Sequence, residues 1–307
     1  MDQAEAPAVL RGRLVVLCAH LVVALVTLVV IGGATRVMEA GLACPDWPLC
    51  YGVLLPGRQM NLQVFLEWFH RLDAFVVGVA LLVLAGVSVL QRRILPVWLP
   101  WAASAALLLV VVQGGLGALT VLRLLEASMV TAHLATALAL VLLLASVTQA
   151  LDSPPADSPP QPRWWLPLAL VSGLPLLVQC LVGGAMASRW AVDACLQSGY
   201  ACQWLGLHRQ LAGPAAAGFL ILALSSWRLP SGHQRLRLLT GLGALLVAGQ
   251  VFLGLTTLRH SLSLPLLTIG HQLLAALLVA LVGSIWGRSL ASPRVDPSRS
   301  VVALPPC

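Results

Sequence analysis

Hydrophobic residues fill eight long runs of this chain, and polar residues collect between them. Each run approaches the roughly 20 residues that a helix needs to cross the hydrocarbon core of a bilayer. The first run lacks a small-residue cleavage site, so we expect it to be retained as a span and not removed as a signal peptide. The pattern predicts an all-α integral membrane protein with eight transmembrane helices, at residues 14–34, 69–90, 97–122, 129–150, 164–187, 207–227, 238–258 and 264–286.

Composition and charge support this class and predict an orientation. Of the 307 residues, 59% are hydrophobic and only 9% are charged, too little charge to cover a soluble protein of this size. All 18 basic residues are arginine, and most flank one end of the predicted helices. The positive-inside rule makes that side cytoplasmic, so we expect a protein of the cell membrane with both termini in the cytoplasm. The net charge of +7 therefore reflects topology and contact with the lipid bilayer, and no nucleic-acid partner is expected.

A polar, proline-rich segment at 151–163 divides the predicted spans four and four. The halves resemble one another, as in the pairs Gly32-Gly33 and Gly183-Gly184, which we interpret as sites of close helix packing. An even number of spans gives both halves the same orientation. We expect two tandem pseudo-symmetric four-helix bundles at 14–150 and 164–287, with cytoplasmic tails at 1–13 and 288–307.

Two histidine pairs share one spacing. His70 and His133 lie 63 residues apart, and so do His208 and His271. The second and fourth helices of a half run in the same direction, so each pair lies at similar depth, towards the outer face. Two axial imidazoles on separate helices can hold one haem iron, whereas zinc normally needs a third or fourth ligand. A single histidine inside a span more often hydrogen-bonds across helices, but four at a repeated spacing favour two haem sites.

An arginine follows the first histidine of each pair, at Arg71 and Arg209. A guanidinium near the outer end of a span can extend to the interface, or it can bind a haem propionate. The sequence leaves both roles open.

Glu67 breaks the similarity of the two halves. It precedes His70 by three residues, so both side chains project from one helix face, and its counterpart in the second half is Leu205. A carboxylate at the membrane boundary could be merely solvated. One turn from a haem site, it could instead handle protons or stabilise developing positive charge. The difference suggests chemistry in the first half and electron handling in the second.

Each half also carries a cysteine pair in its first outer loop, Cys44 with Cys50 and Cys195 with Cys202. Such pairs oxidise readily outside the cytoplasm. The prolines between Cys44 and Cys50 favour a tight turn that could bring the sulfurs together. We therefore hypothesise disulfides; metal binding is less expected, because the spacing exceeds two to four residues.

The stretches 32–36, 41–52 and 67–71 resemble haem A synthase of the bacterial, cysteine-bearing type, and the similarity extends over all eight spans. The resemblance implies an enzyme that oxidises the C8 methyl group of haem O to the formyl group of haem A for terminal oxidases. It implies a substrate site at His70, His133 and Glu67, and a haem b cofactor at His208 and His271. The cysteine pairs match the loop pairs of that family. Haem O synthase and a membrane electron donor are the partners it implies.

The main alternative is a non-enzymatic di-haem electron carrier similar to membrane cytochromes b. It predicts equivalent sites in both halves, and the contrast between Glu67 and Leu205 weighs against it. A haem-delivery protein, the third class, would need neither the carboxylate nor stable double ligation.

Overall fold

The computed structural model describes residues 5–153, 160–186, 203–260 and 263–293. Within these ranges the chain forms eight helices long and apolar enough to cross a membrane; the residues between them contain a short 3-10 helix at Gly57–Gln59, an isolated β-bridge between Cys50 and Val53, and no strand. The predicted all-α class is confirmed. The helices are α1 (Glu5–Val37), α2 (Leu62–Leu90), α3 (Leu99–Leu122), α4 (Ala127–Asp152), α5 (Trp165–Met186), α7 (Gln203–Ser226), α8 (Gln234–Arg259) and α9 (Pro265–Ala291).

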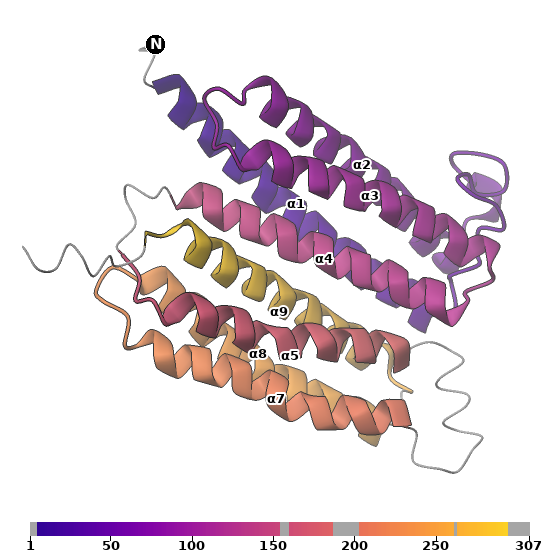
Figure 1. The fold of residues 1–307 in the computed structure, drawn as a ribbon. Coiled ribbons are helices and arrows are strands. Elements are labelled where there is room, and N and C mark those ends of the chain that lie inside the picture. Colours follow the sequence, from indigo (N-terminus) through magenta and orange to yellow (C-terminus); the bar gives the residue numbers. More distant parts are fainter. Residues whose placement is uncertain (1–4, 154–159, 187–202, 261–262, 294–307) are drawn as a thin grey trace, which may run out of the picture.

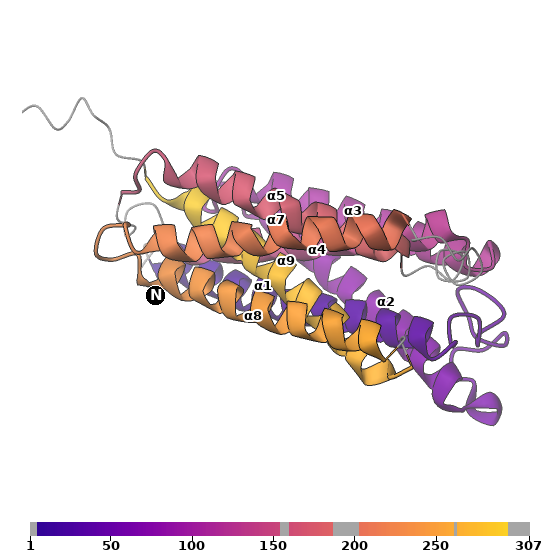
Figure 2. The ribbon, with the colours of Figure 1, turned by 90° about the horizontal axis from the view of Figure 1, so that it is seen from below.

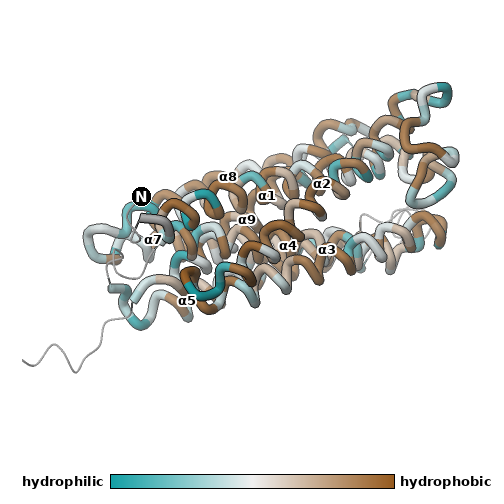
Figure 3. Tube along the Cα trace, turned by 90° about the horizontal axis from the view of Figure 1, so that it is seen from above, coloured by the Kyte–Doolittle hydropathy of each residue, from teal (hydrophilic) through white to brown (hydrophobic). Residues whose placement is uncertain are grey.

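The helices run side by side along one common direction (Figures 1 and 2). Helices α1 to α4 form one group, and α5, α7, α8 and α9 form the other (Figure 1). Helices α4 and α9 pack against each other where the two groups meet. The start of α1 and the end of α9 lie at the same end of the bundle, and the long α1–α2 loop lies at the opposite end. Hydrophilic residues concentrate towards these two ends (Figure 3). This distribution is the one that a membrane-spanning bundle requires.

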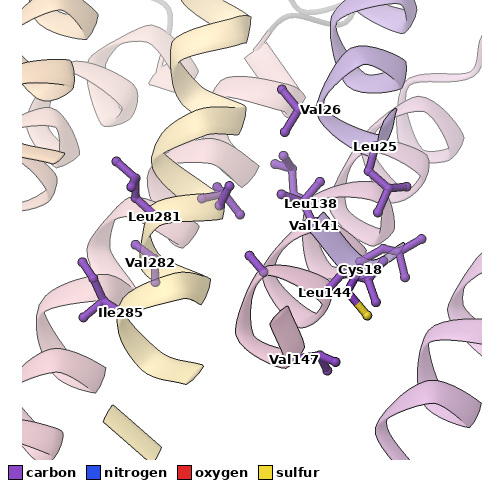
Figure 4. Close-up of a cluster of buried hydrophobic side chains, with 14 of the residues drawn as sticks. Cys18, Leu25, Val26, Leu138, Val141, Leu144, Val147, Leu281, Val282 and Ile285 are labelled. Carbon is purple, nitrogen blue, oxygen red and sulfur yellow. The ribbon is translucent and has the colours of Figure 1, made fainter. Parts of the chain in front are cut away.

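The main core forms where the two groups of helices meet. Side chains from α1, α4 and α9 converge there, among them Leu25, Leu144 and Val282 (Figure 4). Two glycines of α9 permit the close approach of α4: a Cβ added at Gly287 would lie 2.1 Å from a backbone oxygen of α4. The hydroxyl of Ser146 also donates to the Gly283 carbonyl at 2.9 Å. Small residues thus let the two groups pack backbone to backbone, as in other membrane helix pairs.

Several helices are longer than their hydrophobic runs. Helix α2 begins at Leu62 instead of residue 69, because the Asn61 side chain caps it by accepting the backbone N–H of Val64 at 2.9 Å. Helix α1 extends into the predicted tail at 1–13, and α9 continues to Ala291, beyond the predicted end of its span at 286. Hydropathy marks only the apolar part of a helix, whereas the backbone hydrogen bonds continue through the polar ends. Glu67 and His70 consequently lie inside α2 and not at its boundary.

Candidate functional site

The structure brings each predicted histidine pair together. The ring centres of His70 on α2 and His133 on α4 are 6.4 Å apart, with 70° between the ring planes. The rings of His208 on α7 and His271 on α9 are 6.5 Å apart at 71°. The two pairs therefore have nearly the same geometry, although they share no residue.

A glycine on the preceding helix makes room for each imidazole. A Cβ added at any of the four glycines would lie close to the Cε1 atom of the facing ring, between 2.9 and 3.3 Å away. Helix packing at Gly32 and Gly183 was expected from the sequence, and the structure shows that the packed group is a histidine ring. The four contacts join Gly32 to His70, Gly117 to His133, Gly183 to His208 and Gly254 to His271.

Both pairs fit a haem. Metal–imidazole bonds of about 2 Å place the centres of two coaxial rings roughly 6 Å apart, close to the separations found here. Each of the four rings has a buried Nδ1 without a hydrogen-bond partner in the described part of the chain. The described residues contain no cluster of three or more histidine, cysteine or acidic side chains that could hold a metal ion. Two imidazoles suit haem, because the porphyrin supplies the other four iron ligands.

Three glutamines, which no sequence prediction covers, lie against three of the histidines. The amide nitrogen of Gln113 is 3.3 Å from Nε2 of His133. The corresponding distance is 3.4 Å for Gln179 with His208 and for Gln250 with His271. Each glutamine stands four residues before the glycine that faces the same ring. This Gln-x-x-x-Gly spacing is the signal by which the sequence could have revealed them.

Glu67 is buried, with 5% of its surface exposed, and each of its oxygens accepts one hydrogen bond. Its Oε2 accepts the backbone N–H of Cys44 at 2.8 Å, and its Oε1 accepts a guanidinium N–H of Arg71 at 2.5 Å. The interpretation of Glu67 as a solvated boundary carboxylate is therefore wrong. A carboxylate buried one turn from His70 has a fixed position relative to that ring.

Arg71 anchors the loop above the first histidine pair. Its guanidinium donates to the carbonyls of Asp46 at 2.6 Å, Leu49 at 2.5 Å and Cys44 at 3.3 Å, besides Glu67. Neither of the roles weighed from the sequence included these contacts, because they depend on the loop conformation. Arg209, its counterpart on α7, is exposed.

The loop itself is held together locally. The expected disulfide joins Cys44 and Cys50, and both cysteines are buried. The Asp46 carboxylate accepts the backbone N–H groups of Gly52 at 2.7 Å and Tyr51 at 2.6 Å. The bond from Gly52 is the main cause that lowers the pKa of Asp46; desolvation opposes it, and the bond from Tyr51 and the charge of Arg71 lower the pKa further. The second expected pair, Cys195 with Cys202, lies outside the described residues.

A polar contact next to His271 joins α9 to α1. Gln272, next to His271 on α9, donates its amide N–H to the backbone carbonyl of Val29 on α1 at 2.9 Å. Gly33 admits this side chain, because an added Cβ would lie 2.1 Å from the Gln272 oxygen. At the matching position Leu134 packs against Gly184. The contact between α9 and α1 is therefore polar, and the matching contact between α4 and α5 is apolar.

Residues 13–282 match the family model COX15-CtaA, described as cytochrome oxidase assembly protein. The Heme A synthase of Shewanella oneidensis is 32% identical over 186 residues, which is 54% of this chain and 54% of that relative. The Heme A synthase of Sphingopyxis alaskensis is 28% identical and the match covers 87% of this chain and 89% of the relative. The Heme A synthase of Rhodospirillum centenum is 28% identical, and the match covers 92% of this chain and 88% of the relative.

Proposed function

The chain belongs to the COX15-CtaA family of cytochrome oxidase assembly proteins, and on that premise we propose that it is a haem A synthase. The proposed reaction oxidises the C8 methyl group of haem O to the formyl group of haem A. Relatives that align over most of the chain carry the name Heme A synthase. The observation that carries the proposal is the matched geometry of the two histidine pairs; among the residues that the structure describes, only the first pair has a buried carboxylate one turn from one of its histidines.

We assign the two sites to different haems. The substrate haem O is held by His70 and His133. The resident haem b is held by His208 and His271, with Arg209 near the outer end of α7 available to a propionate. Bound haem b supplies reversible one-electron transfer, for which double imidazole ligation is suited. The buried Glu67, whose counterpart in the second half is Leu205, supports this division.

Glu67 is the proposed catalytic residue. Its two oxygens are hydrogen-bonded to the Cys44 N–H and to Arg71, which keeps the carboxylate in place one turn from His70. Each carboxylate oxygen has a further lone pair that can accept a hydrogen bond or a proton. A fixed negative group also stabilises positive charge that develops at the reacting methyl carbon. Arg71 acts on Glu67 and on the loop that covers the site.

The proposal includes an arrangement in the membrane. The bundles at 14–150 and 164–287 form two tandem pseudo-symmetric units, joined through the segment at 151–163. Both termini are cytoplasmic, and the haem sites lie towards the outer face. Haem O synthase supplies the substrate, and a membrane electron donor reduces haem b. The matched ring geometries and the arginine distribution support this arrangement.

Co-expression with a source of haem O tests the function. The membranes are extracted with acidic solvent and the pigments are separated and identified by mass. Haem A in cells that carry this chain, and none in cells that carry the empty vector, is the expected result. Haem O and haem b without haem A would instead favour the di-haem electron carrier, which the matched histidine pairs could also serve.

A further inference from the structure

The position three residues after each histidine is polar in the first half and leucine in the second. The residues at these positions are Asp73 after His70, Thr136 after His133, Leu211 after His208 and Leu274 after His271. Residues three apart on a helix are neighbours on its surface, so each of these side chains lies one turn from a histidine. The two histidine pairs, whose ring geometries agree, therefore differ in their surroundings one turn further along the helices.

Asp73 and Thr136 lie on the same side of the first histidine pair. Helices α2 and α4 both start at the end of the bundle that carries the α1–α2 loop (Figure 1), so three residues further on leads towards the middle of the bundle in both. Both helices also pack against α1 and α3, and their histidine rings meet. The pair thus has Glu67 one turn towards the loop, and Asp73 and Thr136 one turn towards the middle of the bundle.

Thr136 is linked to the histidine site by a hydrogen bond. Its hydroxyl donates to the side-chain oxygen of Gln113, besides two backbone carbonyls of its own helix. The amide nitrogen of the same glutamine lies 3.3 Å from Nε2 of His133. The hydroxyl oxygen of Thr136 retains lone pairs that can accept a further hydrogen bond. Thr136 therefore brings a polar group to the space beside the His133 ring.

Asp73 is an ionisable side chain inside a span. Among the acidic residues of the described helices it lies farthest from a helix end. It is partly buried and forms no hydrogen bond or ion pair within the described part of the chain. Ionisable groups inside spans are costly, and they almost always face the bundle interior and pair with another group there. A molecule bound at the neighbouring histidine pair can supply that partner.

The haems assigned to the two halves differ at one substituent. Haem b carries a vinyl group where haem O carries a hydroxyethylfarnesyl group, which combines one hydroxyl with a long hydrocarbon tail. This substituent and the propionates are on opposite edges of the porphyrin. Charged propionates favour the aqueous interface, and the tail favours the hydrocarbon interior. The hydroxyl therefore enters the first site on the side where Asp73 and Thr136 lie.

We propose that Asp73 and Thr136 bind the hydroxyl group of haem O and so select haem O over haem b in the first half. A carboxyl group and a hydroxyl can both form hydrogen bonds with that hydroxyl, whereas a vinyl group can form none. Haem b in the first site would leave both residues without this partner, which is how a polar site rejects an analogue that lacks a hydroxyl. In the second half, Leu211 and Leu274 suit a vinyl group. This inference rests on the proposed function and assigns the two polar residues to substrate specificity.

Haem binding, followed by absorbance, tests the inference without turnover. The sample is the full-length purified protein with His208→Ala, which confines bis-histidine binding to the first half. Haem O and haem b are titrated separately, and the ratio of their dissociation constants is compared between variants, so that the contribution of the tail cancels. Asp73→Leu, which copies the second half, should lower the preference for haem O at least about tenfold, through weaker binding of haem O alone. Asp73→Asn keeps hydrogen-bonding groups and should lower it less.

Two further measurements separate the hydroxyl from other effects. Thr136→Val removes the second hydrogen-bonding group at nearly constant volume and should lower the preference several-fold. Iron haematoporphyrin, which carries hydroxyethyl groups in place of the vinyl groups and has no tail, should follow haem O in both variants. In a His133→Ala background, which leaves the second site, Leu211→Asp should strengthen binding of iron haematoporphyrin relative to haem b.

An unchanged preference in Asp73→Leu, equal weakening of both haems, or no gain in Leu211→Asp would each overturn the inference. Should Asp73→Leu hold neither haem, Thr136→Val decides by the same ratio. Haem A formation is measured separately in the protein with all four histidines. Haem A together with an unchanged preference in the variants would refute only this inference. The expected preferences without haem A would refute the proposed function and leave the recognition of the hydroxyl standing.

Discussion

The two halves of the molecule hold their histidines alike and surround them differently. Ring separation and angle agree between His70–His133 and His208–His271 to within 0.1 Å and 1°. Above the first pair, Glu67 and Arg71 tie a disulfide-linked loop to α2. In the second half the position of Glu67 is occupied by Leu205. The proposed assignment accordingly places the chemistry at the pair with the buried carboxylate and electron transfer at the other pair.

The largest effect is expected from Glu67→Ala. Loss of the carboxylate should lower haem A formation at least about 100-fold, within the range for a lost general acid or base. The haem at His208 and His271 should remain, because Glu67 does not contact that pair. Extracted pigments and the reduced spectrum measure both outcomes. Glu67→Gln preserves an acceptor for the Cys44 N–H and separates loss of charge from loss of the loop contact; wild-type haem A in both variants would eliminate the catalytic role.

Alanine substitution of the glycines that face the histidine rings should lower haem binding more, the closer the added Cβ lies to the ring. Gly183→Ala places a Cβ 2.9 Å from His208, a distance that forces the ring to move, whereas Gly32→Ala leaves 3.3 Å to His70. We expect Gly183→Ala to lose most of the haem in the second half and Gly32→Ala to lose less of that in the first. Haem content per protein gives the answer. Gly114→Ala is the control, because nothing lies within 4 Å of its added Cβ.

A smaller effect should follow from Arg71→Gln. The variant removes charged hydrogen bonds to three loop carbonyls and Glu67, each bond contributing about 1.5–3 kcal/mol. The loop should open more often, and the Cys44–Cys50 disulfide should become reducible several-fold faster. Alkylation after timed reduction, read by mass spectrometry, follows the rate. Arg209→Gln is the matched control, and an equal increase there would show that Arg71 has no special hold on this loop.

The smallest effect should come from the crossing between the halves. Gln272→Leu removes the bond to the Val29 carbonyl. It makes this contact apolar, like the contact of Leu134 with Gly184 at the matching position. The expected loss of stability is about 0.5–1.5 kcal/mol. Thermal unfolding in detergent measures it. Leu134→Gln, the reverse change at the matching position, should not raise the stability. Destabilisation by several kcal/mol in Gln272→Leu would mean that this contact does more than join two helices.

Much of the fold could be predicted from the sequence. Each span is a long apolar run, and the 63-residue spacing of the histidines is sufficient to pair them once the helix directions are known. The early start of α2 was also encoded, in the capping residue Asn61, but hydropathy does not register a cap. The disulfide of Cys44 with Cys50 followed from their spacing and the turn between them.

The contacts of Glu67 and Arg71 with the loop could not be predicted in the same way. They are made to backbone atoms of the loop, whose positions depend on local turns such as the left-handed conformations of Tyr51 and Gly52. Hydropathy and spacing carry no information on such dihedral angles. The glutamines beside the histidines were different, because their distance from the glycines repeats in the sequence. Only the structure showed that both residues face the same ring.

The central claim is that the duplicated ligands hold two different haems, and the pigments of two single variants test it most directly. His70→Ala and His208→Ala are each produced in full length with a haem O source, purified, and extracted. His70→Ala should retain haem b and lack haem O and haem A, whereas His208→Ala should lose haem b. Loss of the same pigment from both variants would contradict the assignment of substrate to the first half and cofactor to the second.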